Sequence, residues 1–538
     1  MSLAKDKNRD GIIRAVKSVF TKSGERSLAD FAGLLFDNGA SEDLAGFSTG
    51  ELAGIVRDAH AALAKRKADS ANISVHPSNA RPGGLTVQVA NNNMPFLFDS
   101  VMSELQKTGV DIALVLHPVL SVTRDKNGTL ESLKADHKKT QHSRANRESM
   151  IHIEIDDLPG SDAVDALEKN LHLVLKDVRM AVQDWKAMLL RLEETILNYK
   201  TNPPPLQEKE IDEAIAFLEW LVNQNFTFLG MRDYAFSGGP KRGTLKRVKN
   251  GGLGILSDPE VRVLRRGREL VTMTPEIREF FMTPEPLIIT KANVKSRVHR
   301  PAYMDYVGVK TFDDKGKVSG ELRIVGLFTS TAYTRSVKQI PMLRQKVEML
   351  LENSEFDKDS HAGKALLNVA ESYPRDELFQ IDLKTLSEFA DNIRQLDERP
   401  RLRVLSRLDK FDRFVSVLVY VPRDRYNSTV RTRIGEYLKQ VYKGRLSAYY
   451  PAFPEGNMAR VHFIIGRSEG ETPKPAQSEL EAEVGKITRT WDDDLRAALG
   501  SATAGHFEGA FPAAYQYAFS GAHAVEDIAR LDAMGEAE

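Results

Sequence analysis

The chain has 538 residues, 75 basic and 75 acidic side chains, and no cysteine. Its zero net charge gives no general attraction to nucleic acid or to an anionic membrane, and no stretch approaches the roughly 18 apolar residues of a membrane span. The lack of cysteine excludes disulfides, thiol nucleophiles and cysteine metal ligands, and with the lack of an export signal it predicts a cytoplasmic protein. The length predicts about three or four domains.

The first part of the chain predicts helices followed by a mixed module. Residues 1–72 carry apolar side chains at helical spacing, such as Ile12, Val16 and Phe20, and are expected to form a helical lead-in. Residues 73–200 are expected to form a first α+β module that ends in long helices. The sequence TNPPP that follows predicts a domain boundary, because successive prolines cannot continue a helix.

The segment Gly84–Leu116 predicts a strand, a loop, a helix and a second strand. Apolar residues first alternate, as in a half-buried strand, and then recur every four residues from Leu97 to Leu105, as on one face of a helix. This order of elements favours ligand sensing over catalysis. The loop between the strand and the helix consists of Asn91, Asn92 and Asn93.

These asparagines are the first candidate effector site. A strand-to-helix junction presents free N–H groups and the positive end of the helix dipole, which favour the carboxylate of an amino acid or of another small effector. The alternative is structural: the asparagines cap the helix and shape the turn, with no ligand involved.

The middle of the chain predicts a second domain with more strand than helix, over residues 206–335, and a helical connector over residues 336–400. Within the domain, polar and aromatic side chains gather at the start of a strand. They either line a pocket or pack into a core with the arginine and aspartate paired at its rim. The cluster comprises Arg300, Tyr303, Asp305 and Tyr306.

Residues 401–500 repeat the strand, loop and helix order of the first module, with Ser428 as the expected helix cap. The two guanidiniums of the loop suit bidentate binding of a carboxylate. Alternatively, they pair with Asp424 and neighbouring acids across a subunit contact. This second candidate effector site consists of Arg423, Arg425 and Asn427. Residues 501–538 are expected to be a tail leading toward a further domain.

The sequence contains no complete motif of the common catalytic or nucleotide-binding sites. Gly252 and Gly254 lack the third glycine and the following helix of a dinucleotide-binding fingerprint, and there is no P-loop, H-E-x-x-H or G-x-S-x-G motif. His137 and His142, five apart in a polar loop, are interpreted as a solvated pair rather than as metal ligands. We therefore predict no catalytic residue, no metal site and no cofactor in this chain.

Six segments make the chain resemble the N-terminal region of the large bacterial NAD-specific glutamate dehydrogenases. The resemblance implies ACT-like modules at about residues 73–157 and 401–500, with a PAS-like α+β domain and helical motifs between them. It also implies a catalytic domain with a Rossmann-type NAD site much further toward the C-terminus. The segments are NNNMPFLFDSV from Asn91, NFTFLGMRDY from Asn225, RPAYMDYVGVKTFD from Arg300, GLFTSTAYTRSVKQIPMLRQKV from Gly326, SHAGKALLNVAESYPRDELFQ from Ser360 and VYVPRDRYN from Val419.

The expected fold is therefore an α+β multidomain chain, with two ACT-like βαββα modules flanking a PAS-like domain and joined by helical connectors. The expected function is regulation and oligomerisation of an enzyme that converts L-glutamate, NAD and water to 2-oxoglutarate, ammonium and NADH. The expected partners are an amino-acid or small-carboxylate effector and further copies of the chain, as a tetramer in the parent enzyme, with no nucleic acid and no membrane. The rival interpretations are a free-standing amino-acid sensor and a self-contained enzyme that uses the Arg300–Asp305 cluster.

Overall fold

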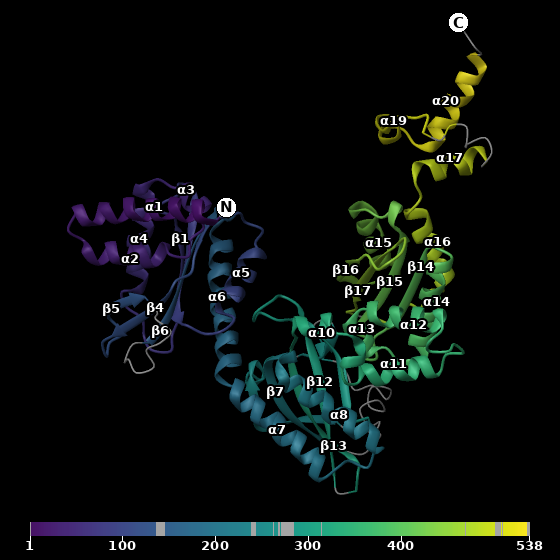
Figure 1. Cartoon of the computed structure of the whole chain (residues 1–538), viewed down its shortest axis with the longest axis horizontal. Helices are drawn as coiled ribbons and strands as arrows, with labels where there is room; N and C mark the ends of the chain where they lie inside the picture. Colours follow the sequence, from purple (N-terminus) through teal and green to yellow (C-terminus); the bar gives the residue numbers. More distant parts are fainter. Residues whose placement is uncertain are drawn as a thin grey trace.

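The computed structural model describes residues 2–135, 146–237, 244–261, 263–266, 269–270, 285–313, 315–468, 470–500, 507 and 509–534. His137, His142 and the segment 238–243 lie outside these residues. Three large antiparallel sheets follow one another along the chain, each with its own helices, so the α+β multidomain class is confirmed (Figure 1). None of the described helices is long and apolar enough to cross a membrane.

The N-terminal helices pack onto the first sheet. Their apolar residues, such as Leu44 and Val56, share a core with Leu114 and Leu116 of the sheet. Ser48 and Glu51 form a capping box that starts the last of the four helices. These helices are α1 (Ser2–Lys22), α2 (Arg26–Phe36), α3 (Ser41–Ala45) and α4 (Thr49–Leu63).

The first sheet has the order β1-β2-β6-β4-β5, and β3 also pairs with β6. Alternate residues of β2 and β6 pack beneath helices α5 (Leu97–Gln106) and α6 (Ser161–Gln183). The far end of α6 reaches the second sheet, where Val178 packs near Leu256 (Figure 1). The strands are β1 (Asn72–Pro77), β2 (Gly84–Asn92), β3 (Ile112–Leu116), β4 (Val119–Arg124), β5 (Leu130–Ala135) and β6 (Asn146–Asp156).

The long helices expected at the end of the first module are α6 and α7 (Trp185–Thr201), which are separated by a break. The break lies at Asp184, whose carboxylate accepts a hydrogen bond from Gly254 N at 2.7 Å and so is tied to the second sheet. This sheet has the order β11-β12-β13-β7-β8, and α8 (Glu208–Trp220) packs against it. Its strands are β7 (Phe226–Ser237), β8 (Thr244–Gly254), β11 (Leu287–Lys295), β12 (Tyr303–Phe312) and β13 (Val318–Phe328).

The helical connector packs between the second and third sheets. One continuous core contains Phe217 and Val307 of the middle domain, Leu386 of the connector, and Leu405 and Leu418 of the third sheet. These parts therefore fold as one packed unit. The connector comprises α10 (Ser330–Thr334), α11 (Leu343–Glu352), α12 (His361–Ser372), α13 (Arg375–Gln380) and α14 (Leu383–Glu398).

The third sheet has the order β14-β15-β17-β16, which matches β1-β2-β6-β3 of the first sheet. The first module therefore repeats this topology, with the β4–β5 pair inserted. Two separate helices, α16 and α17, follow the sheet. The elements are β14 (Arg403–Leu408), β15 (Phe414–Pro422), α15 (Ser428–Val441), β16 (Arg445–Ala452), β17 (Met458–Gly466), α16 (Gln477–Ile487), α17 (Trp491–Leu499), α19 (Ala513–Ala518) and α20 (Gly521–Met534).

Candidate functional site

The structure places the first candidate loop in a strand rather than at a helix cap. Asn91 and Asn92 continue β2 and pair with residues of β6, while α5 begins only after Phe96. Phe96 has a left-handed φ of 67°, and no side chain caps the helix. The predicted capping role of the asparagines is therefore wrong, because strand pairing holds their backbone.

The side chain of Asn92 belongs to a polar network that is largely buried. Arg66 Nη2 donates to Asn92 Oδ1 at 2.6 Å and to Glu148 Oε1 at 2.7 Å. Arg124 also holds Glu148, with Nε and Nη2 at 2.7 and 2.8 Å. Burial alone raises the pKa of Glu148, but the hydrogen bonds from the two arginines outweigh it and lower the pKa. The network ties α4 to the first sheet.

The second candidate loop lies between β15 and α15, and its three side chains point to different partners. Arg423 donates to the backbone oxygens of Pro454 and Met458, which belong to the β16–β17 turn. Arg425 pairs with Asp493 Oδ2 of α17 at 3.0 Å, within the same chain. Asn427, rather than Ser428, caps α15 by accepting a hydrogen bond from Val430 N at 2.9 Å.

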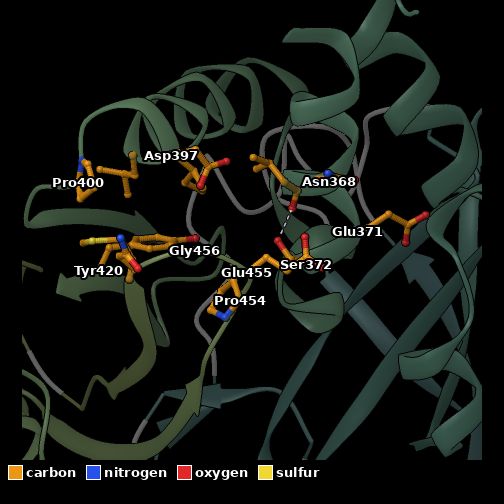
Figure 2. Close-up of a pocket in the computed structure, with 14 residues that line it drawn as sticks. Asn368, Glu371, Ser372, Asp397, Pro400, Tyr420, Pro454, Glu455 and Gly456 are labelled. Carbon is orange, nitrogen blue, oxygen red and sulfur yellow. Dashed lines mark hydrogen bonds between the residues drawn. The ribbon is translucent and has the colours of Figure 1, made fainter. Parts of the chain in front are cut away.

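A cavity of about 610 Å³ opens beside this loop, between the helical connector and the second module (Figure 2). Buried apolar side chains, including Val369, Leu396 and Met458, form part of its lining. Its polar groups come from α12, α14, β15 and the turn that Arg423 holds. They include Asn368, Asp397, Tyr420, Glu455 and Asn457.

The electrostatics of this cavity favour a positively charged group. Among the described residues that line it there are carboxylates but no lysine, arginine or histidine. Burial, followed by the charges of Glu398 and Glu455, raises the pKa of Asp397. A ligand with an ammonium group and an apolar body suits this lining. The contributing residues come from four separate stretches of sequence, so no local spacing predicted the site.

The Arg300–Tyr306 cluster is a buried ionic junction. Lys291 Nζ lies 2.6 Å from Asp305 Oδ1 and 3.0 Å from Asp376 Oδ2, so one cation serves two carboxylates. Tyr333 donates to the other oxygen of Asp376 at 2.9 Å. Burial raises the pKa of Asp305 to about 6, against the charge of Lys291 and with the help of Asp376.

The expected pairing of Arg300 with Asp305 at the rim does not occur. Arg300 donates instead to the backbone oxygen of Phe328 at 2.6 Å, and Asp305 is only 2% exposed. No motif in the sequence marks Lys291, which comes from the neighbouring strand β11. The junction joins the second sheet to α13.

Models of known protein families match four consecutive stretches of the chain. Family models for glutamate dehydrogenase describe an ACT1 domain at residues 31–171, helical motif 1 at 340–399, an ACT2 domain at 403–492 and helical motif 2 at 495–534. The two expected ACT-like modules are therefore confirmed, and the first match begins within α2.

Relatives of known name agree with these domain matches. The NAD-specific glutamate dehydrogenases of Halomonas elongata and Pseudomonas aeruginosa are 35% and 34% identical over 460 residues, which is 84% of this chain. That of Mycobacterium tuberculosis is 28% identical over 484 residues, or 86% of this chain. The matched region spans only 28% of the length of each relative.

Proposed function

Because this chain is a member of the glutamate dehydrogenase family and carries its ACT1, ACT2 and helical-motif domains, we propose that it is the regulatory and oligomerisation region of an NAD-dependent glutamate dehydrogenase. The parent enzyme interconverts L-glutamate and 2-oxoglutarate with ammonium and NAD. In this proposal, the nicotinamide site and the catalytic residues lie in a part of the parent enzyme that has no counterpart in this chain.

The observation that carries the proposal is the order of four regulatory and helical domains over a stretch that is 28% of each named relative. The local structure around Gly254 supports it. This glycine ends β8 with a φ of 58°, and a Cβ there would lie 2.2 Å from Leu229 O. Its small size thus serves close packing of β8 on β7 rather than a strand-to-helix phosphate loop. The PAS-like character of the middle domain stays part of the proposal.

The effector in this proposal is an amino acid bound in the cavity of Figure 2. Its ammonium group faces Asp397 and Glu455, and Arg423 fixes the turn that forms one wall. The acidic lining disfavours a simple carboxylate, since like charges repel. Asn91, Asn92 and Asn93 remain candidate effector residues in this proposal, although they do not line this cavity.

A thermal-shift screen of amino acids tests the effector proposal. A ligand present at a hundred times its Kd stabilises the folded chain by about 2.7 kcal/mol. Asp397→Asn and Arg423→Ala are expected to remove the shift, whereas Glu388→Gln, an exposed position on the same helix α14, leaves it unchanged. If no amino acid stabilises the chain, the effector proposal fails.

The oligomerisation proposal predicts that the purified chain associates with itself. In the parent enzyme the expected assembly is a tetramer. Strand β16 is an edge of the third sheet, with free backbone groups and exposed Tyr449 and Tyr450, which suit contact with another copy. Sedimentation velocity over a range of concentrations measures this association. A chain that stays monomeric throughout contradicts the proposal.

A further inference from the structure

A second cleft lies between the middle domain and the edge strand β16, apart from the cavity of Figure 2. Its outer part has a volume of about 360 Å³, and Lys295 and Tyr303 line one wall while Tyr449 and Tyr450 line the other. A narrow inner part of about 50 Å³ continues toward the second module. Both parts share Tyr303, Ser447 and Tyr450 in their linings, so they adjoin each other, and together they are called the cleft.

The walls of the cleft are aromatic and open to solvent. Tyr450 is 51% exposed although it lies within the well-paired strand β16, whereas the ring centroid of its neighbour Tyr449 lies 4.4 Å from Arg431 Cζ of α15. On the opposite wall, Lys295 Nζ lies 5.3 Å from the centroid of the Tyr303 ring. Large rings that stay exposed beside a concave surface provide stacking area for a flat ligand.

The charges around the inner part are mostly matched in pairs. Glu377 Oε2 accepts from Arg407 Nη2 at 3.0 Å, and Asp409 Oδ2 lies 2.6 Å from Arg413 Nε. Lys291 serves Asp305 and Asp376 together, as described above. Each carboxylate that lines the inner part is therefore already held by a cation.

Two cations at the cleft are left without such a match. Within the described part of the chain, neither Lys295 nor Arg445 has a carboxylate within 4.0 Å, and the Arg445 guanidinium has no hydrogen bond, although its backbone pairs within the sheet. The buried Arg467 guanidinium, which also lines the inner part, donates to backbone oxygens such as those of Tyr442 and Glu471. Lys295 and Arg445 therefore leave positive charge at the cleft beside the exposed ring of Tyr450.

We propose that this cleft binds a planar organic anion. The ring of the ligand lies between Tyr303 and Tyr450, and its anionic group is held by Arg445 and Lys295, with the Ser447 hydroxyl as a further donor. The occupant contacts both the middle domain and the second module. This site is separate from the proposed amino-acid cavity, and none of the four domain descriptions names a ligand site there.

Isothermal titration calorimetry of the full chain with naphthoate tests the proposal. We expect measurable binding of naphthoate, and at least about tenfold weaker binding of naphthamide, which lacks the charge, and of cyclohexane carboxylate, which lacks the planar ring. Arg445→Gln, Lys295→Gln and Tyr450→Ala are each expected to weaken naphthoate about tenfold. Matched control variants Arg433→Gln and Tyr517→Ala, both exposed and away from the cleft, should bind normally.

Three outcomes overturn the inference: no binding of naphthoate, equal binding of naphthoate and naphthamide, or unchanged binding by both Arg445→Gln and Tyr450→Ala. Because these substitutions lie on the surface, the variants are expected to fold, and their unfolding temperatures verify this. The amino-acid screen does not involve this cleft, whereas the proposed self-association uses the same edge strand β16, and the naphthoate comparisons do not depend on self-association. Together these experiments therefore separate failure of this inference from failure of the proposed function.

Discussion

Replacing Lys291 with methionine tests the ionic junction that joins the middle domain to α13. The substitution keeps an unbranched side chain of similar length but removes the ammonium group that lies 2.6 Å from Asp305 and 3.0 Å from Asp376. Both carboxylates then lose their cation. Asp305 is 2% exposed and cannot turn to water.

The expected loss is about 3 kcal/mol, the lower end of the range for removing one partner of a buried ion pair. The lower end applies because Asp305, whose pKa is already about 6, takes up a proton once Lys291 is gone. For the same reason the loss is expected to shrink at pH 5. The double substitution Lys291→Met with Asp305→Asn should restore part of the stability, because it removes the unmatched charge.

Trp220 offers a local reporter, since it is 7% exposed within the core of the middle domain. The chain has 3 tryptophans, so Trp185→Phe and Trp491→Phe leave Trp220 as the only fluorescent indole. Denaturant unfolding of this background measures the middle domain without requiring the whole chain to unfold in one step. Lys317→Met, on the β12–β13 hairpin, is the control. A Lys291→Met variant within about 1 kcal/mol of its background refutes the assigned role.

Three further predictions concern stability. Because burial raises the pKa of Asp305 from 3.8 to about 6, the folded chain holds this proton more tightly, and stability should fall by about 2 kcal/mol as pH rises from 4 to 6. Asp305→Asn should flatten that profile in unfolding experiments at successive pH values. Asn92→Ala removes an acceptor of Arg66 and should cost about 1 to 3 kcal/mol in urea unfolding, whereas no change contradicts the network. Arg425→Ala should lower the free energy of unfolding by at most about 1 kcal/mol in urea, because the ion pair of Arg425 with Asp493 is partly exposed to solvent. A larger loss contradicts the expectation that solvent screens this pair.

The sequence predicts elements well where the pattern is local. Alternating apolar residues predicted β2 and β15, and the spacing of Leu97, Val101 and Leu105 predicted the buried face of α5. The asparagine loop shows where local reasoning ends. Asn91 and Asn92 suit a helix cap, but pairing with the distant strand β6 places them inside the sheet.

The candidate site depends still more on contacts between distant segments. The arginines of the second loop are visible in the sequence, yet their partners, Pro454 O and Asp493, are set by the turn after β16 and by α17. The acidic cavity gathers side chains from α12, α14 and β15. Lys291 comes from a strand without any motif, so its two carboxylate partners emerge only from the packing of β11, β12 and α13.

A continuous assay of NADH oxidation with 2-oxoglutarate and ammonium tests the central claim most directly. The claim is that this chain serves regulation and oligomerisation of the parent enzyme. Catalysis, in this account, belongs to a part of the parent enzyme that has no counterpart in this chain. We predict that purified chain, at any concentration, gives a rate equal to that of the reaction mixture without protein. A rate that rises in proportion to the concentration of the chain contradicts the account.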